Sequence, residues 1–262
     1  MRTLVVGADG FIGRHLMPLL DEPCAFDGDI RDPHAVQLAV EQFQPDTIIN
    51  LAGVFRGSLA DMSDVHLDGA ANLRDAAGTC RILSAGSAAE YGIVPPRPVK
   101  EDFPCAPVSG YGMTKFLATQ ALGEDATVFR PSNVIGPGMS PDLLLGNVIR
   151  QLKKGEATIE VSALHTIRDY VDVNDVASAI VALVQLPPGI YNVSSGVGTS
   201  TDALLATLRQ VSERDFAVTT GPVPTQSSEL DVFIADSSKL QSLGWRPLVS
   251  LEQSVRATWE AA

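Results

Sequence analysis

The sequence is poor in basic residues, in cysteine and in long apolar runs. Its 262 residues include 19 Lys and Arg against 31 Asp and Glu, which gives a formal net charge of −12. A nucleic-acid-binding surface needs a basic stripe, so we expect no nucleic-acid partner. No apolar run reaches the length of a membrane span, and the first residues are predicted to form a core strand rather than a signal peptide. We therefore expect a soluble, cytoplasmic protein without a membrane partner.

The few cysteines exclude a disulfide scaffold and a cysteine-based metal centre. Cys24, Cys80 and Cys105 are odd in number and lack the spacing of metal ligands. They are predicted to be reduced and mostly buried, and no metal is expected. Because the chain as a whole is acidic, any anionic ligand must be bound by helix N-termini, loop N–H groups and a few arginines.

A strand, a glycine-rich turn and a helix are predicted at the start of the chain. Residues 3–6 are rich in β-branched side chains, and Gly7-Ala-Asp-Gly-Phe-Ile-Gly13 follows directly. In such a turn, backbone N–H groups approach a pyrophosphate and the helix N-terminus favours its charge. The pattern favours a dinucleotide site, and three turn glycines without a ligand are the alternative. Pro18 is predicted to kink or shorten the helix.

Predicted strands and helices then alternate, which indicates an α/β fold: a doubly wound parallel sheet with helices on both faces. Ligands of such sheets lie at the carboxyl ends of the strands. We assign residues 1–136 with 169–193 to this Rossmann domain, and 137–168 with 194–262 to a smaller α/β substrate lobe. The expected strands of the sheet are 3–6, 24–26, 47–53, 81–84, 127–130 and 189–193, and its expected helices include 33–43, 64–77 and 111–122.

Polar residues mark several predicted helix starts. Asp32 is expected to be an N-cap, with Pro33 at the first helical position. Asn174-Asp175 is expected to cap the helix that follows. Ser250 with Gln253 is predicted to form a capping box for the last helix.

Tyr111 and Lys115 are the first candidates for chemistry. Four residues apart in a predicted helix, they share one face. A nearby ammonium favours the phenolate and draws the tyrosine pKa, ordinarily near ~10, toward the range of a general acid or base. The spacing is also a common accident of exposed helices. Ser87 follows the strand 81–84 and falls in the ligand zone of the sheet, although a loop serine is usually a turn residue.

The acidic turn after the second strand bears on the phosphate state of a dinucleotide. An acid at the strand end, such as Asp27, would accept hydrogen bonds from the adenosine ribose and favour NAD over NADP. Asp29 lies in the same turn, and the turn does not decide which acid faces the ribose. Arg31 or Arg14 could instead meet a 2′-phosphate, so NAD and NADP both stay open.

Eight segments run in one order over nearly the whole chain. They are Gly7-Ala-Asp-Gly-Phe-Ile-Gly13, Asn50-Leu-Ala-Gly53, Gly86-Ser-Ala-Ala-Glu-Tyr-Gly92, Tyr111-Gly-Met-Thr-Lys115, Arg130-Pro-Ser-Asn-Val-Ile-Gly-Pro-Gly138, Arg168-Asp-Tyr-Val-Asp-Val173, Tyr191-Asn-Val-Ser-Ser-Gly196 and Leu243-Gly-Trp245. With these segments the chain resembles the extended short-chain dehydrogenase/reductase family, of the NAD-dependent epimerase/dehydratase type. The last third is most similar to GDP-4-keto-6-deoxymannose reductases, and the compressed second strand resembles that of dTDP-4-keto-6-deoxyhexose reductases.

The resemblance implies a role for each site residue. Tyr111 would be the general acid/base, Lys115 would hold the nicotinamide ribose and lower the tyrosine pKa, and Ser87 would hydrogen-bond the reacting oxygen. The implied cofactor-binding residues are Gly7, Asp9, Gly10, Phe11, Ile12, Gly13, Asp27, Asp29, Ile30, Leu51, Ala52, Gly53, Tyr111, Lys115, Pro131, Asn133 and Val134. The implied substrate-binding residues are Ser87, Ala88, Tyr111, Asn133 and Arg168.

Arg168 and Asn133 match family positions that contact the nucleotide diphosphate. An arginine fork suits phosphate because it can make two charge-assisted hydrogen bonds. The alternative for Arg168 is an intramolecular ion pair with Asp169 or Asp172.

Ala88 and Ala89 argue against one reaction of the family, the elimination of water by a 4,6-dehydratase. The family's 4,6-dehydratases carry acidic residues at these positions, and alanine can neither donate nor accept a proton. We therefore expect NAD(P)H-dependent reduction of a keto group on a nucleotide-activated sugar of the 4-keto-6-deoxyhexose type. One alternative is a nucleotide-sugar 4-epimerase with tightly bound NAD. Another, of a different class, is a non-catalytic NAD(P)-sensing regulatory protein.

Three features depart from the family pattern. His66 stands where the family usually has a helix Asn. The stretch 225–230 lacks the Arg that commonly clamps the diphosphate, which leaves room for a different carbonyl substrate. The helix from Tyr111 is shorter than usual, and since that helix commonly builds the family's dimer, a homodimer is a possible assembly.

Overall fold

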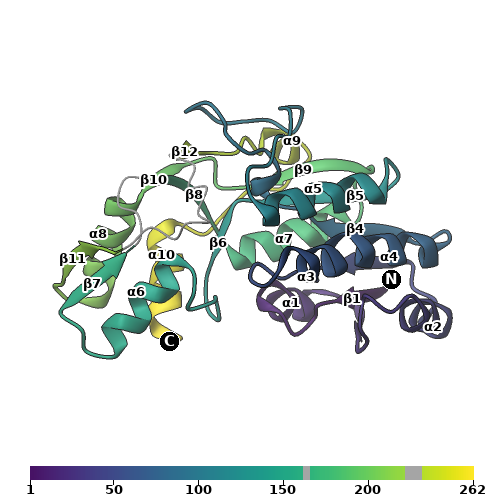
Figure 1. Ribbon diagram of the computed structural model, residues 1–262, viewed down its shortest axis with the longest axis horizontal. Coiled ribbons are helices and arrows are strands. Elements are labelled where there is room, and N and C mark those ends of the chain that lie inside the picture. Colours follow the sequence, from purple (N-terminus) through teal and green to yellow (C-terminus); the bar gives the residue numbers. More distant parts are fainter. Residues whose placement is uncertain (162–165, 222–231) are drawn as a thin grey trace.

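A six-stranded parallel sheet occupies one side of the molecule (Figure 1). The computed structural model describes residues 1–161, 166–221 and 232–262. The sheet has the order β2-β1-β3-β4-β5-β9. Its strands are β1 (Arg2–Val6), β2 (Glu22–Phe26), β3 (Thr47–Asn50), β4 (Arg81–Ala85), β5 (Thr127–Pro131) and β9 (Gly189–Val193). The strand order reverses between β1 and β3, so the crevice that binds ligands in such sheets is expected at the carboxyl ends of these two strands.

Helices cover both faces of this sheet, as the alternation of strands and helices predicted. One face carries α1 (Phe11–Leu16) and α7 (Val173–Leu183), and the other carries α2 (Pro33–Phe43), α4 (Gly69–Ala77) and α5 (Gly110–Leu122). Successive strand residues point to opposite faces, so Ile48 packs under α2 and α4 whereas Ile49 packs under α7. The predicted doubly wound fold is confirmed.

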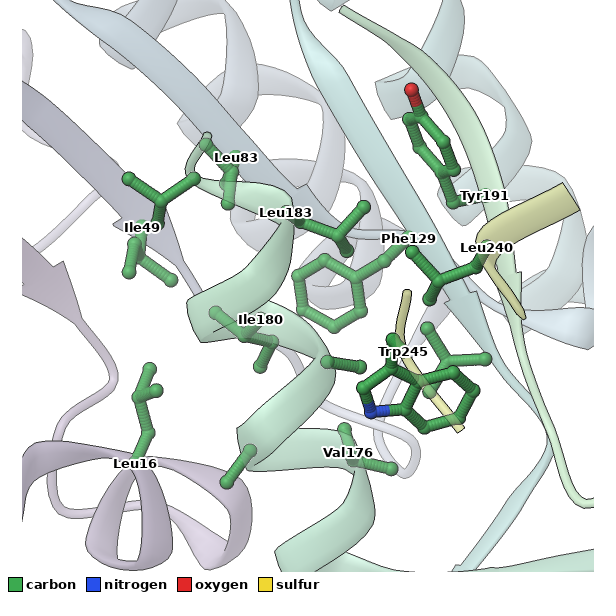
Figure 2. Packing of buried hydrophobic residues seen from close by; sticks show 14 of the residues in the cluster. Leu16, Ile49, Leu83, Phe129, Val176, Ile180, Leu183, Tyr191, Leu240 and Trp245 are labelled. Carbon is green, nitrogen blue, oxygen red and sulfur yellow. The ribbon is translucent and has the colours of Figure 1, made fainter. Parts of the chain in front are cut away.

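The core under α7 shows what holds this face together (Figure 2). Ile180 and Leu183 of α7 pack against Leu83 and Phe129 of the sheet, and Trp245 closes one side of the cluster. Burying a side chain of this size contributes roughly 1.5–3 kcal/mol. The indole Nε1–H of Trp245 donates to Ser178 Oγ at 2.9 Å, so its polar group is satisfied inside the core.

The smaller unit lies beside the sheet and ends in the C-terminal helix (Figure 1). Its strands are β6 (Asn133–Ile135), β7 (Thr158–Val161), β8 (Ile167–Asp172), β10 (Gly198–Ser200), β11 (Ala217–Thr220) and β12 (Val232–Phe233). β8 pairs with β6, β10 and β12, and β7 pairs with β11. Its helices are α6 (Leu144–Lys153), α8 (Thr201–Ser212) and α10 (Leu251–Glu260), whereas Leu240 of α9 (Ser238–Ser242) packs into the core of the large sheet beside β9. The boundaries assigned to the two lobes stay a prediction. In the structure, β6 and β8 pair with each other outside the large sheet.

Two predicted helix starts are confirmed and one is wrong. Asp32 caps α2, with Pro33 as its first residue, and Ser250 forms the capping box of α10 with Gln253. The cap of α7 is Asp172 rather than Asn174-Asp175, because the Asp172 carboxylate accepts the Asn174 N–H at 2.7 Å. Asp175 lies in the first turn and accepts the N–H groups of residues 248 and 249.

The helix predicted over 64–77 begins earlier than expected. It starts with α3 (Leu59–Ser63) behind a Ser58–Asp61 capping box, passes through a π-helical turn over Asp64–Asp68 and continues as α4. β3 ends at Asn50 rather than at residue 53, since the Asn50 side chain accepts the N–H of Ala52 and turns the chain out of the sheet. α1 ends at Leu16, before a 3₁₀ turn that contains Pro18, which confirms the predicted shortening. In the described ranges, every helix is too short or too polar to cross a membrane.

Candidate active site

A cavity of about 690 Å³ opens at the carboxyl ends of β1, β3 and β4 and extends to β8 of the smaller unit. The loops after β3 and β5 and the first turns of α5 and α6 supply further walls. The predicted site residues that line the cavity are Gly7, Gly10, Phe11, Ile12, Gly13, Leu51, Gly53, Ser87, Tyr111, Lys115, Pro131, Asn133, Val134 and Arg168. The fold therefore brings most of the sequence-predicted set to one cavity.

The glycines of the first turn have structural reasons of their own. Gly7 has a φ of +80°, which glycine adopts without strain. A Cβ on Gly13 would lie 2.3 Å from Gly7 O and 2.4 Å from Ala8 O, so only glycine lets the helix start this close to the turn. Gly10 N donates to Gly7 O at 3.0 Å and closes the turn. Because Gly10 and Gly13 also line the cavity, the backbone of this turn is open to a ligand, and the turn fits a dinucleotide phosphate.

Lys115 lines the cavity, and its ammonium lies between backbone carbonyls at the end of β4 and just after β3. Its Nζ donates to Ala85 O at 2.9 Å and lies 3.5 Å from Ala52 O. A Cβ on Gly53 would lie 3.2 Å from Nζ, so a glycine leaves the space that the ammonium occupies. Burial lowers the pKa of Lys115 to about 8, and the nearby Glu90 carboxylate opposes this shift.

Tyr111 stands one helical turn before Lys115 on α5, whose N-cap is Ser109. Burial raises the pKa of the Tyr111 phenol, and the Ser87 side chain acts in the opposite direction. Burial thus outweighs the lowering that the resemblance implied. The phenol holds its proton at neutral pH, which is the form that a general acid needs.

Glu90 supports the turn that carries Ser87, and it was not among the predicted site residues. The acid is fully buried, and its Oε1 accepts the Ser87 N–H at 2.8 Å. Its Oε2 accepts from Arg130 Nε at 2.9 Å and from Thr119 Oγ1 at 3.0 Å. Burial raises the pKa of Glu90, and the Arg130 guanidinium lowers it. The sequence signal was present, because Ser87-Ala-Ala-Glu90 is a capping-box pattern.

Apolar walls complete the cavity on the side of the smaller unit, and the sequence did not indicate them. Phe55 lies in the loop after β3, and Met139, Leu143 and Leu144 precede or begin α6. Arg56 and Asp142 join these two wall segments through an ion pair of 3.4 Å between Nη1 and Oδ2. A loop side chain gives no periodic pattern, so only the fold identifies these residues.

Six predicted residues do not line the cavity: Asp9, Asp27, Asp29, Ile30, Ala52 and Ala88. Asp27 still follows β2 directly, and the last residues of β1 and β2 are aligned in the sheet, which places it next to the glycine turn. Asp29 pairs with Arg31 at 2.6 Å, and this partner lowers the pKa of Asp29 to about 2. Ile30 is buried under α4. Across the described parts of the chain, no three His, Cys, Asp or Glu residues are grouped to hold a metal ion.

Arg168 lines the cavity from β8, and its Nη1 donates to the neighbouring Ile167 O at 3.1 Å. The two acids weighed as its partners have other roles. Asp169 accepts hydrogen bonds from the backbone and side chain of Ser195, and Asp172 caps α7. The stretch 225–230, which has no arginine to clamp the diphosphate, lies outside the described residues.

Comparison with known proteins agrees with the fold. The model of the NAD dependent epimerase/dehydratase family matches residues 3–194. The dTDP-6-deoxy-L-talose 4-dehydrogenase (NAD(P)(+)) of Kitasatospora kifunensis is 29% identical over 99% of this chain and 95% of its own length. The GDP-6-deoxy-D-mannose reductase of Pseudomonas aeruginosa is 28% identical over 99% of this chain and 97% of its own length. The UDP-glucose 4-epimerase of Thermus thermophilus, solved in complex with NAD, superposes with a TM-score of 0.90 at 27% identity and covers 100% of this chain and 98% of its own.

The chain belongs to the NAD dependent epimerase/dehydratase family. The resemblance to extended short-chain dehydrogenases/reductases that the motifs predicted is thereby confirmed. The similar proteins differ in reaction, since their names include a dehydrogenase, a reductase and an epimerase.

Proposed function

We propose that the protein is an NAD(P)H-dependent reductase of a nucleotide-activated 4-keto-6-deoxy sugar. Its family and its similar proteins support the broader statement that it is an NAD(P)-dependent enzyme that modifies nucleotide-sugars. Two of the similar proteins carry names of 6-deoxy-sugar oxidation or reduction, which supports the narrower one.

The observation that carries the proposal is that Tyr111 and Ser87 line the same cavity, with Lys115 one turn further along α5 on the same wall. When bound beside the glycine turn, the reduced nicotinamide supplies hydride to the keto carbon. Tyr111 gives its phenolic proton to the oxygen of that carbon, and Ser87 donates a hydrogen bond to the same oxygen. Lys115 holds the nicotinamide ribose and, as a cation, stabilises the phenolate that remains on Tyr111.

The predicted binding residues are proposed to take the following roles. The turn Gly7–Gly13 would hold the pyrophosphate, and Leu51 and Gly53 the adjoining ribose and ring. Pro131 and Val134 would flank the nicotinamide, Asn133 and Arg168 would bind the substrate diphosphate, and Asp27 or Asp29 would face the adenosine. Ile30 and Ala52, which do not line the cavity, would support its wall from behind.

Two features, one next to Ser87 and one on the cavity wall, favour reduction of a 6-deoxy sugar. Ala88 and Ala89 leave no proton-transferring group after Ser87, so elimination of water has no acid or base there. Phe55, Met139 and Leu144 give the far wall an apolar surface, which suits a sugar methyl group better than a hydroxymethyl group.

A 4-epimerase would use the same Tyr111, Lys115 and Ser87, and the structural similarity to a UDP-glucose 4-epimerase keeps it as the rival. The two reactions differ in their cofactor balance. A reductase consumes one reduced nicotinamide for each sugar reduced. An epimerase returns the hydride to its product and leaves the nicotinamide absorbance unchanged.

The test is to mix the purified protein with NADH or NADPH and a panel of GDP- and dTDP-linked 4-keto-6-deoxyhexoses, and to follow nicotinamide absorbance and product mass. We expect one-to-one consumption. Tyr111→Phe should lower kcat by about 10²–10⁴-fold and leave cofactor affinity nearly unchanged. Tyr191→Phe is the matched control, because the Tyr191 hydroxyl donates to Pro187 O. Cofactor binding without turnover of any carbonyl would instead indicate an NAD(P)-sensing protein.

A further inference from the structure

His66 lies under the active site in the π-helical turn over Asp64–Asp68. Its side chain is buried, and both ring nitrogens have partners. Nε2 lies 3.0 Å from the backbone N of Val54, and Nδ1 lies 2.8 Å from Thr114 Oγ1. Thr114 Oγ1 in turn donates to the carbonyl oxygen of Tyr111 at 3.1 Å. These contacts form one chain from the loop after β3 to the first turn of α5.

The directions of these hydrogen bonds fix the state of the ring. Val54 N–H can only donate, so Nε2 must accept and must be unprotonated. A neutral imidazole then carries its proton on Nδ1, which donates to Thr114 Oγ1 and leaves the threonine proton for Tyr111 O. A second proton on Nε2 would point at the N–H of Val54. Burial and the nearby Lys115 lower the pKa of His66 to about 3, which agrees with a neutral ring.

Two further contacts place the ring beside the reacting groups. The imidazole meets the Tyr111 ring edge to face, with centroids 5.6 Å apart and an interplanar angle of 82°. A Cβ on Gly53 would lie 3.4 Å from His66 Nε2 and 3.2 Å from Lys115 Nζ. The loop that lines the cavity is thus packed between the histidine and the lysine, and a displaced histidine would move both the loop and the tyrosine.

We propose that His66 is a positioning residue: as a neutral, Nδ1-protonated histidine it ties the Val54 loop to the first turn of α5 and so sets Tyr111 in its reacting position. This inference rests on the proposed reductase activity. It assigns a role to a residue at which the sequence departs from its family, and it concerns the placement of Tyr111 rather than proton transfer by His66 itself.

The kinetic test is a double-variant cycle of His66→Phe and Thr114→Val with the keto-sugar substrate. His66→Phe keeps an aromatic ring beside Tyr111 and removes both hydrogen bonds, whereas Thr114→Val cuts the chain at its next link. We expect each to lower kcat on the order of ten- to a hundredfold, with smaller changes in KM and in the NADPH Kd. The double variant should be no slower than the slower single variant, because both changes interrupt the same chain.

Rescue and control variants separate positioning from general support of the fold. His66→Gln keeps one acceptor and one donor at a similar reach, so it should recover most of kcat. His34→Phe is the matched control, since His34 lies in the first turn of α2, and it should retain wild-type kinetics. Additive losses in the double variant, or unchanged kcat in both single variants, would overturn the proposal.

A measurement without substrate distinguishes a failure of this inference from a failure of the proposed function. Nitrogen NMR of the wild-type protein resolves the ring state of its four histidines, and the signal missing from His66→Gln assigns His66. We expect an Nδ1–H tautomer that stays neutral wherever the protein is folded. An Nε2–H tautomer or a charged ring would contradict the inference, independently of any catalytic activity. If the expected tautomer is found but no carbonyl is turned over, the reductase proposal fails and the positioning of Tyr111 for reduction fails with it.

Discussion

The Glu90 carboxylate accepts the backbone N–H of Ser87 at 2.8 Å, and so a fully buried acid holds the serine at the edge of the cavity. The same carboxylate pairs with Arg130, whose side chain is only 2% exposed and whose guanidinium carbon lies 4.7 Å from the centre of the Tyr91 ring. Among the described residues, Arg130 Nη1 is one of two buried polar side-chain atoms without a hydrogen-bond partner. The turn that carries Ser87 thus rests on a buried ion pair that is costly to break from either side.

Arg130→Met should lower the free energy of unfolding by roughly 3–5 kcal/mol at neutral pH, because it leaves the Glu90 charge buried without its partner. Glu90 already has a raised pKa in the folded protein, and loss of Arg130 removes a cause that lowers it. The folded state then binds more protons than the unfolded state above the ordinary glutamate value of 4.5, so stability should fall as pH rises from there.

Urea denaturation at a series of pH values measures this effect. Arg256→Met is the control, since its pair with Glu252 is exposed and should contribute less than about 1 kcal/mol. Adding Glu90→Gln to Arg130→Met should remove the pH dependence. Equal losses from the two arginine variants would contradict a buried pair that supports the turn.

Local signals in the sequence were enough to predict the sheet and most of its helices, and the predicted Ser87, Tyr111 and Lys115 line one cavity. These features depend on periodicity and on short motifs, which survive without knowledge of tertiary contacts. Two kinds of feature were missed. The cap of α7 was assigned to Asn174-Asp175 because several acids compete there, and only the fold shows that Asp175 binds the 248–249 backbone.

The contacts of His66 and the apolar walls were missed for a second reason. His66 meets Thr114 across 48 positions of the chain, and Phe55 and Leu144 line one cavity only because the fold brings their segments together. Long-range contacts of this kind leave no pattern in a short window of sequence. The sequence did mark His66 as unusual, but it could not show what the side chain touches.

Asp29→Asn should shift the cofactor preference toward NADPH. Asp29 now holds Arg31 through both carboxylate oxygens, at 2.9 Å and 3.0 Å from Nε and 2.6 Å from Nη2. Without that charge, Arg31 is free to meet a 2′-phosphate beside the carboxyl end of β2. We expect the ratio of kcat/KM for NADPH over NADH to rise on the order of tenfold, as for one charge-assisted hydrogen bond.

Steady-state kinetics with both cofactors measures this ratio. Asp75→Asn is the matched control, because it breaks the similar Arg74–Asp75 pair on α4. An unchanged ratio, or a shift toward NADH, would show that Arg31 does not face the cofactor.

Met113→Glu with Leu117→Glu should separate a homodimer into single chains. Leu59, Val108, Met113 and Leu117 are 60%, 45%, 42% and 40% exposed. Leu59 lies against the start of α5, and α3 and α5 run together on the outer face of the large unit (Figure 1). Exposed apolar side chains on these neighbouring helices fit a second copy of the chain, which is the assembly that the resemblance implies. Light scattering should give twice the mass of one chain for the wild type and a single-chain mass for the variant.

Leu248→Glu is the control for this change, at a more exposed position away from α3 and α5, and it should leave the assembly unchanged. A wild-type monomer would rule the dimer out.

Cofactor affinity should decrease as pH rises through about 8, the pKa to which burial lowers Lys115. Below that pH the ammonium is present to donate to the nicotinamide ribose, and above it the neutral amine has lost one donor and the charge. If only the ammonium form binds well, Kd should rise up to about tenfold per pH unit above the pKa.

Fluorescence titration with NADPH across this range measures the effect in the absence of substrate. Lys115→Met should bind weakly at every pH without an inflection near 8, and Lys153→Met, at the end of α6, should behave as the wild type. An inflection that persists in Lys115→Met would assign the titration to another group and would remove Lys115 from the ribose site.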